Sequence, residues 1–237
     1  DHYIKFGAQA IQHLFTPGVL SYGSSEQQDT TLGAKRTYAK EFSLYVEDDY
    51  LITPKVKVNV GVHASGFLVE GKFYRSLQPR FSARYLITPK ISWKTSYAQM
   101  TQFIHLLSNV GIGLPTDLWV PSTSLIEPEQ SYLTSTGVAY NLKNTYEFII
   151  EGYYKQMKGL IEYKEGASYM NIESDWQTKV EKGEGESYGA EFFIQKKTGK
   201  LNGWVGYTLS WTNRTFPNIN EGKTFPYRYD RRHDIEI

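Results

Sequence analysis

The stretch YLITPKVKVNVGVHAS, residues 50–65, decides the fold. Valines at every second position from 56 to 62 alternate with Lys57, Asn59 and His63. Because successive side chains of a strand point to opposite faces of its sheet, this alternation predicts a strand with one apolar face and one polar face. The proline in the preceding YLITPK fixes φ and has no N–H group, which favours a tight turn before the strand.

The six residues YLITPK occur again at 85–90, also between two alternating runs. The repeat predicts two successive hairpins of one sheet, although repeated hairpins also occur in soluble β arrays. Other segments alternate in the same way, and together they predict about ten strands and no helix. The predicted strands span 3–13, 37–46, 55–65, 79–87, 90–99, 131–142, 145–157, 187–196, 201–211 and 233–237.

Two features of these strands indicate a membrane barrel rather than a soluble sandwich. Several alternate over about ten residues, which at ~3.3 Å per residue and a tilt near 45° crosses an apolar band of roughly 25 Å. Short and long links also alternate, so all tight turns would lie on one side and all long loops on the other. We therefore expect an all-β, antiparallel transmembrane β-barrel. The short links are 51–55, 86–90, 142–145 and 197–200, and the long ones are 14–36, 67–77, 100–130, 158–186 and 212–232.

Composition narrows the partners and the chemistry. The 237 residues carry a net charge of +1 without a basic stripe, so nucleic acid is not an expected partner. The absence of cysteine excludes disulfides and thiolate metal sites. The five histidines are scattered, and we expect neither a metal nor a cofactor. No apolar run approaches the ~18 residues of a membrane-spanning helix.

The sequence GESYG, residues 185–189, matches the nucleophile elbow G-x-S-x-G. That motif needs a helix after the serine, whereas Ser187 is followed by the alternating run YGAEFFIQK. We therefore expect no enzyme activity. A surface esterase remains an alternative, and it would need a reactive Ser187.

The polar faces of the predicted strands carry charged side chains. A Lys or Arg at the midplane of a barrel's lipid face costs about 2–4 kcal/mol, so these groups are expected to line the interior. That interior would be a water-filled channel, a surface that grips a plug, or both. The residues are Lys55, Lys57, Asn59, His63, Arg80, Arg84, Lys90, Lys94, Glu147, Glu151, Glu191 and Gln195.

Longer motifs extend over most of the chain from residue 40 onward. They are SLQPRFSARYLIT (76–88), HLLSNVGIGLPTDLWVPS (105–122), EGYYKQMKGLIEYKEGAS (151–168), YGAEFFIQKKTGKLNGWVGYTLSWTNRTF (188–216) and INEGKTFPYRYDRRHDIEI (219–237). These motifs resemble the barrel of TonB-dependent outer-membrane receptors, in the branch of SusC-like and carboxypeptidase-regulatory-domain-bearing transporters. The resemblance implies a location in the bacterial outer membrane. It also implies a barrel of about 22 strands, closed by an N-terminal plug and energised by the periplasmic protein TonB.

About ten strands are less than half of the implied barrel, and no plug-like region or TonB box precedes them. Open strand edges would be an aggregation hazard in water and unsatisfiable in lipid. We therefore interpret residues 1–237 as part of one barrel domain, with the plug and the remaining strands absent from this chain. The alternative is a complete small barrel that closes on itself.

The function implied by the resemblance is active import of a nutrient too scarce or too large for porins. Extracellular loops would capture the ligand, which would then pass through the lumen. The expected partners are TonB, the plug domain, outer-membrane lipids and a surface lipoprotein lid. Siderophore, glycan and peptide ligands all stay open. The alternative is a passive outer-membrane channel or an adhesin-like barrel without energy coupling.

The connection 100–130 is too apolar for a solvated loop tip. The resemblance places it at the extracellular rim, where it would fold over the barrel mouth and contribute to a ligand site. Alternatively, it caps the strand ends and packs on neighbouring loops. The candidate ligand-binding residues in the long loops are Trp119, Asp117, Phe103, His105 and Trp176.

The segment RYDRRHD, residues 228–234, brings Asp, Arg and His close together. An inward network of charges would satisfy these groups without any catalysis, by pinning the loop to the barrel wall. The residues predicted to line the lumen or form such networks are Arg80, Arg84, Glu147, Glu151, Arg228, Asp230, Arg232 and Asp234.

Overall fold

A computed structural model describes residues 1–16, 20–24, 27–32, 36–107, 118–166 and 175–237, and for 20–24 and 27–32 it describes the backbone alone. The described part of the chain contains no helix with the length and hydropathy that a bilayer-crossing helix needs. Its only helical elements are two short 3₁₀ turns, η1 (Trp176–Lys179) and η2 (Asn220–Gly222).

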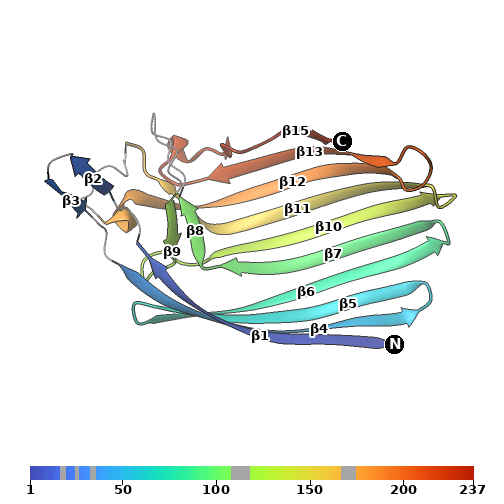
Figure 1. Ribbon diagram of the computed structural model, residues 1–237, viewed down its shortest axis with the longest axis horizontal. Helices are drawn as coiled ribbons and strands as arrows, with labels where there is room; N and C mark the ends of the chain where they lie inside the picture. The colour runs from blue at the N-terminus through green and yellow to red at the C-terminus, as the bar shows by residue number, and fades with distance from the viewer. Residues whose placement is uncertain (17–19, 25–26, 33–35, 108–117, 167–174) are drawn as a thin grey trace.

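The chain forms one curved, open antiparallel sheet of 11 strands (Figure 1). The long strands follow one another in chain order, and two short strands both pair with the last of them. The sheet consists of β1 (His2–Phe15), β4 (Thr37–Thr53), β5 (Val56–Val69), β6 (Lys72–Thr88), β7 (Ile91–Gln102), β10 (Glu129–Leu142), β11 (Tyr146–Tyr163), β12 (Val180–Lys196), β13 (Gly203–Thr215), β14 (Phe225–Pro226) and β15 (His233–Glu236). Separate hairpins are formed by β2 (Leu20–Ser24) with β3 (Gln27–Leu32) and by β8 (Ile104–Leu107) with β9 (Leu118–Pro121). Each of the ten predicted strands is present, which confirms the all-β antiparallel fold.

The repeated YLITPK builds the same turn twice. The hydroxyl of Thr53 accepts the N–H groups of Lys55 and Val56 at 3.3 and 3.1 Å, between β4 and β5. The hydroxyl of Thr88 accepts those of Lys90 and Ile91 at 3.2 and 3.0 Å, between β6 and β7. A register shift lies beside each turn, between residues 51 and 53 and between 86 and 88. The two successive hairpins predicted from the repeat are therefore confirmed.

The strands continue further than the sequence patterns indicate. Residues 67–77, predicted as a long loop, instead belong to β5 and β6 and are joined by a turn at Glu70 and Gly71, with φ of 48° and 79°. Two positive φ values suit a two-residue hairpin turn, whose twist matches that of the flanking strands. The end of the sheet that carries this turn and the β8–β9 hairpin is here named the loop end, and the opposite end is named the turn end.

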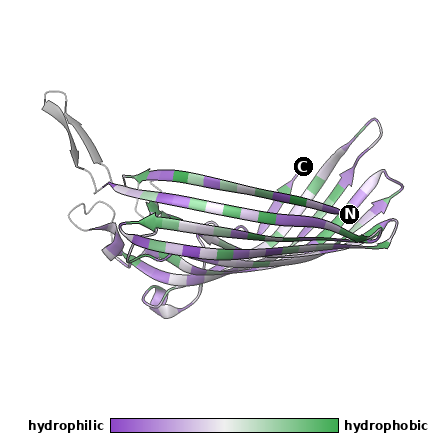
Figure 2. Ribbon diagram, turned by 90° about the horizontal axis from the view of Figure 1, so that it is seen from below, coloured by the Kyte–Doolittle hydropathy of each residue, from purple (hydrophilic) through white to green (hydrophobic). Residues whose placement is uncertain are grey.

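Hydrophilic and hydrophobic residues alternate along the strands (Figure 2), so the two faces of the sheet differ in chemistry. One, the apolar face, carries most of the large exposed hydrophobic side chains, such as Leu44, Leu77 and Ile150. The other, the polar face, carries the charged residues that the sequence places on the alternate positions. A transmembrane barrel turns its apolar band outward and its polar face inward, so the polar face is the inner one.

Buried apolar side chains gather at the loop end rather than along the sheet. One cluster joins Phe103 to the ends of β4 and β5, through Ala39, Phe67 and Val69. A second joins the β8–β9 hairpin to the ends of β11 and β12, with Leu107, Val120, Ile126, Ile161, Tyr163 and Val180. The hairpin thus crosses the intervening strands as a strap (Figure 1).

Candidate functional site

A row of charged side chains crosses the polar face. Lys57 lies directly opposite Arg84, which lies opposite Lys94 on the next strand. The same row continues through Gly137 to Glu151 and Glu191. Directly opposed residues of an antiparallel pair share one face, so the row is positive on β5–β7 and negative on β11–β12. We name it the charged row.

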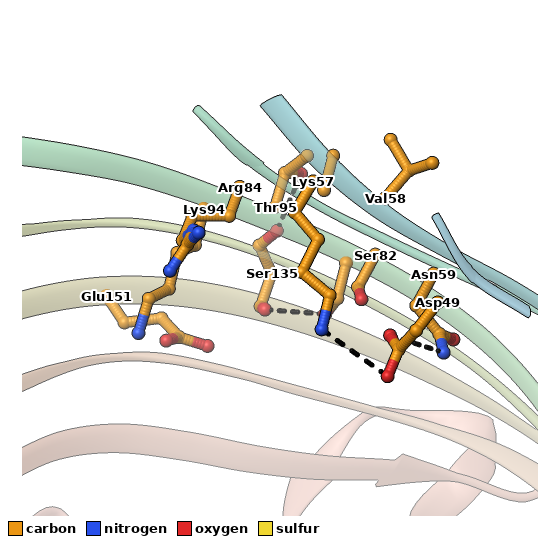
Figure 3. A pocket seen from close by; sticks show the side chains of 12 residues that line it. Asp49, Lys57, Val58, Asn59, Ser82, Arg84, Lys94, Thr95, Ser135 and Glu151 are labelled. Atoms are coloured by element: carbon orange, nitrogen blue, oxygen red, sulfur yellow. Dashed lines mark hydrogen bonds and ion pairs between the residues drawn. The ribbon is translucent and has the colours of Figure 1, made fainter. Parts of the chain in front are cut away.

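The positive half lines a hollow of ≈ 300 Å³, and the carboxylates of Asp49 and Glu151 also belong to its lining (Figure 3). Lys57 pairs with Asp49 at 3.4 Å, and Asn59 also donates to Asp49 at 3.1 Å. Arg84 and Lys94 have no ion pair within the described residues, and the buried Nε of Arg84 has no hydrogen-bond partner there. Arg84 and Lys94 are cross-strand neighbours, and the Nε–H group of Arg84 lacks an acceptor among the described residues. Such a pair of cations suits a carboxylate or a phosphate.

The negative half brings two carboxylates together. Glu151 and Glu191 are cross-strand partners, and neither has an ion pair in the part of the chain that the structure describes. Like charges that face each other directly destabilise a sheet, so this position suits a cation from another segment or molecule. Nearby, Glu147 is already paired with Lys197 at 2.7 Å.

The strap and the residues that follow it as far as Glu129 form an arrangement that resembles a catalytic triad. Nε2 of His105 lies 3.1 Å from the hydroxyl of Ser122, and its Nδ1 lies 3.1 Å from a carboxylate oxygen of Glu129. His105 and Ser122 are both 0% exposed, so no substrate reaches the hydroxyl. The three side chains therefore satisfy one another and fix the strap to β10. The sequence patterns missed this group, because its members match no motif and meet only through the way the connection 100–130 folds back.

Ser187 lies inside β12, where its hydroxyl is 3.0 Å from that of Thr212 on β13. The strand continues on both sides of Ser187, so the residue is not held on the strand-to-helix turn that the nucleophile elbow requires. The described geometry offers no support for the esterase alternative.

The structure separates the five candidate ligand-binding residues. Trp119 on β9 is 57% exposed, and Trp176 on η1 packs against the cluster that holds the strap. Phe103 and His105 are buried, so they would reach a ligand only if the strap moved. Asp117 lies outside the described residues. The packing of the strap corresponds to the interpretation in which the connection 100–130 caps the strand ends and packs on neighbouring loops. Ligand contact by the five residues stays a prediction.

The predicted network residues fall into two groups. Arg80, Arg84, Glu147 and Glu151 lie on the polar face, as the register shows. The others lie in the segment before and within β15. There Asp230 accepts the N–H of Thr212 at 2.7 Å and pairs with Arg232 at 3.1 Å.

The remaining contacts of residues 228–234 hold this segment against β13 and join its own side chains to one another. The guanidinium of Arg232 lies over the ring of Trp211, 4.6 Å from its centroid, and that of Arg228 lies 5.0 Å from the ring centroid of Tyr229. Asp234 pairs with Arg231 at 3.3 Å and lies opposite Thr208, next to the acidic half of the charged row. These contacts need no catalytic role.

A further ion pair, which the sequence patterns missed, closes the loop end. Glu162 and Arg214 meet at 3.2 Å, and each side chain is 13% exposed. Burial raises the pKa of Glu162, and the charge of Arg214 opposes that rise. Arg214 also lies over the ring of Tyr227 at 3.5 Å, which ties β13 to the segment that follows it. No group of three or more potential metal ligands occurs within the described residues.

Comparison with solved structures shows the fold of outer-membrane transporters. The chain is similar to the ferric-catecholate import receptor Fiu from K12 E. coli, with a TM-score of 0.65 and 14% identity over 98% of this chain and 38% of that one. It is similar to the ferripyoverdine receptor of the outer membrane of Pseudomonas aeruginosa, with 0.64 and 12% over 99% and 32%. It is also similar to the copper transporter OprC, with 0.62 and 10% over 95% and 36%. The chain thus spans about a third of the length of these proteins. A comparison with curated proteins finds no match.

The family comparison covers nearly the whole chain. The family described as "TonB dependent receptor-like, beta-barrel" matches residues 5–232. The strand order, the polar inner face and the outward apolar face agree with such a barrel. The chain therefore belongs to the β-barrel family of TonB-dependent receptors.

Proposed function

We propose that the whole protein imports a scarce or bulky nutrient across the outer membrane and that TonB supplies the energy. The family supports this proposal, as do similar structures that are described as iron, copper and siderophore transporters or receptors. The observation that carries it is the charged row, which faces inward with a cationic half and an acidic half. A plug domain in the lumen would provide partners for these unpaired charges.

In this proposal the plug domain fills the lumen beside the charged row. Cationic side chains of the plug would neutralise Glu151 and Glu191, and anionic side chains would neutralise Arg84 and Lys94. Such pairs hold a plug in one orientation but exchange with water when it is pulled, because they lie next to a polar lumen. The ligand would then move along the same face.

The finer assignment is to the branch of SusC-like and carboxypeptidase-regulatory-domain-bearing transporters. The motifs at 188–216 and 219–237 carry the resemblance to this branch, and they form β12, β13 and the segment that closes onto β13. A surface lipoprotein lid would then be a partner. The exposed Trp119 would contact the ligand or this lid.

The test of energy coupling uses cells that express the full-length receptor, with and without a functional TonB. Growth medium that contains ferric siderophores, glycans and peptides is analysed for the compounds that the cells remove. Import by this route predicts that one compound disappears only when both receptor and TonB are present. Removal without TonB would favour the passive channel, and single-channel conductance of the purified receptor in a planar bilayer would support that alternative.

A further inference from the structure

One cation lies on the apolar face near the loop end. Arg75 is exposed and lies opposite Gly66, which in turn lies opposite Phe42, so all three positions share the apolar face. Within the described residues Arg75 has no ion pair and no hydrogen-bond partner for its side chain. A second cation, Lys40, lies on the same face, two positions along β4 from Phe42.

Arg75 stands at the edge of a groove of ≈ 570 Å³ on this face. Small residues, Ala64 and Gly66, form its floor, because their neighbours on β4 and β6 are much larger. The ring of Phe73 lies over Gly66, where a Cβ atom would meet it at 2.7 Å. The walls are Phe42, Leu44, Phe73 and Leu77, which are 50%, 63%, 60% and 63% exposed. The groove is therefore apolar and open to the membrane.

The height of Arg75 places it among lipid headgroups. The strand from Thr88 at the turn end to Arg75 covers about 30 Å along the membrane normal, at ~3.3 Å per residue and a tilt near 45°. The apolar face of β11 and β12 turns polar at Gln156 and Glu186, about 23 Å along the membrane normal from the turn-end pair Tyr146 and Lys196. A cation on the lipid face is costly at the midplane and nearly free at the interface, so this position is the one where an arginine is tolerated.

We propose that Arg75 and this groove bind lipid A, the phosphorylated anchor of lipopolysaccharide. The guanidinium binds a phosphate in bidentate fashion, and an acyl chain lies between Phe42, Leu44, Phe73 and Leu77. Lys40 adds a second positive charge for the same headgroup. Lipid A is favoured over a phospholipid because the loop end of an outer-membrane barrel faces the outer leaflet. The proposal rests on the outer-membrane location and not on import.

Native mass spectrometry of the full-length receptor in mild detergent tests the site. Lipid A and phosphatidylglycerol are titrated in turn against the wild-type protein and against Arg75→Ala and Ala64→Leu, which fills the floor of the groove. Arg80→Ala is the matched control, because it removes a cation from the polar face of the same strand. Folding of every variant is checked by the shift in gel mobility on heating. Arg75→Gln replaces Arg75→Ala should the alanine variant fail that check.

The wild type and Arg80→Ala should bind lipid A with equal affinity and more tightly than phosphatidylglycerol. Arg75→Ala should weaken lipid A binding roughly tenfold, as expected for loss of one charge-assisted contact. Ala64→Leu should also weaken it while leaving Arg75 in place. Unchanged binding in either variant overturns the site, and equal affinity for phosphatidylglycerol overturns the assignment to lipid A. Uptake by these variants reports separately on the proposed import.

Discussion

The rings of Phe103 and Phe67 stack with their centroids 4.9 Å apart and their planes 2° apart. Phe103 begins the strap, whereas Phe67 lies on β5. The strap is held at its other side by the cluster around Leu107 and Val120. It is therefore fastened on two sides of the sheet.

Replacing Phe103 by Ala should release the strap from β5. Loss of a buried phenylalanine costs about 3–5 kcal/mol, and this loss lowers the free energy needed for the strap to open locally. We expect a protease added to intact cells to cleave between Phe103 and Glu129 in the variant but not in the wild type. Trp119→Ala is the control, because Trp119 is exposed and its loss leaves the stack intact. Equal resistance of both variants would show that the second cluster holds the strap alone.

Gly137 and Gly152 offer a matched pair for testing how β10 and β11 fit together. A Cβ atom at Gly137 would lie 2.7 Å from the carbonyl oxygen of Ile150 and 3.0 Å from Cα of Glu151, whereas one at Gly152 would have its nearest neighbour at 3.8 Å. We expect Gly137→Ala to destabilise the barrel by about 1–3 kcal/mol, since backbone atoms must move, and Gly152→Ala to change it little. The temperature at which heating alters gel mobility measures the difference. Similar midpoints for both variants would contradict the fit.

The sequence predicted the strands because inner and outer residues alternate in a membrane barrel. It did not predict their ends. At 67–77 the strands continue to a two-residue turn at Glu70 and Gly71, and the inward side chains of Phe67 and Val69 are apolar because they pack in one cluster with Phe103. The period of two is therefore reliable where the inner face is polar and weak where a loop packs against that face.

The site was harder to predict than the fold. Individual charges such as Arg84, Lys94 and Glu151 were assigned to the interior from alternation alone. Their alignment in one row depends on register, which is set by the shifts beside the Thr53 and Thr88 turns. The contact of His105 with Glu129 depends on how the strap folds back, which no local pattern specifies.

The pair of Glu162 and Arg214 gives the loop end a pH dependence. Burial raises the pKa of Glu162 above its ordinary value of 4.5, so the folded state favours the protonated carboxyl. The resulting contribution to stability is present below pH 4.5 and is lost as the pH rises through the raised pKa. Glu162→Gln should therefore gain stability relative to the wild type as the pH rises from 4.5 to 7. Unfolding temperatures of the two proteins across this range measure the trend. An opposite trend would show that the attraction of Arg214 outweighs burial.

Trp119 is the candidate ligand contact that the structure leaves accessible. Replacing it by Ala should weaken ligand uptake roughly tenfold, the order expected for an exposed aromatic anchor, and should leave the gel-mobility shift on heating unchanged. Uptake is measured with the compound identified by depletion of the growth medium. Unchanged uptake would remove Trp119 from the ligand site without affecting the assignment to the family.

Glu151 and Glu191 test whether the lumen is plugged. If cations of a plug neutralise this pair, replacing both Glu151 and Glu191 by Gln removes the two negative charges that bind those cations. The plug would then be held less tightly. We expect cells with the double variant to become several-fold more sensitive to a large antibiotic such as vancomycin, which the outer membrane normally excludes. Ser187→Ala, on the same face of β12, is the control. In an unplugged channel the substitution would relieve repulsion between the two carboxylates, so stability would rise and sensitivity would stay constant. Measuring antibiotic sensitivity together with the unfolding temperature therefore separates the two architectures.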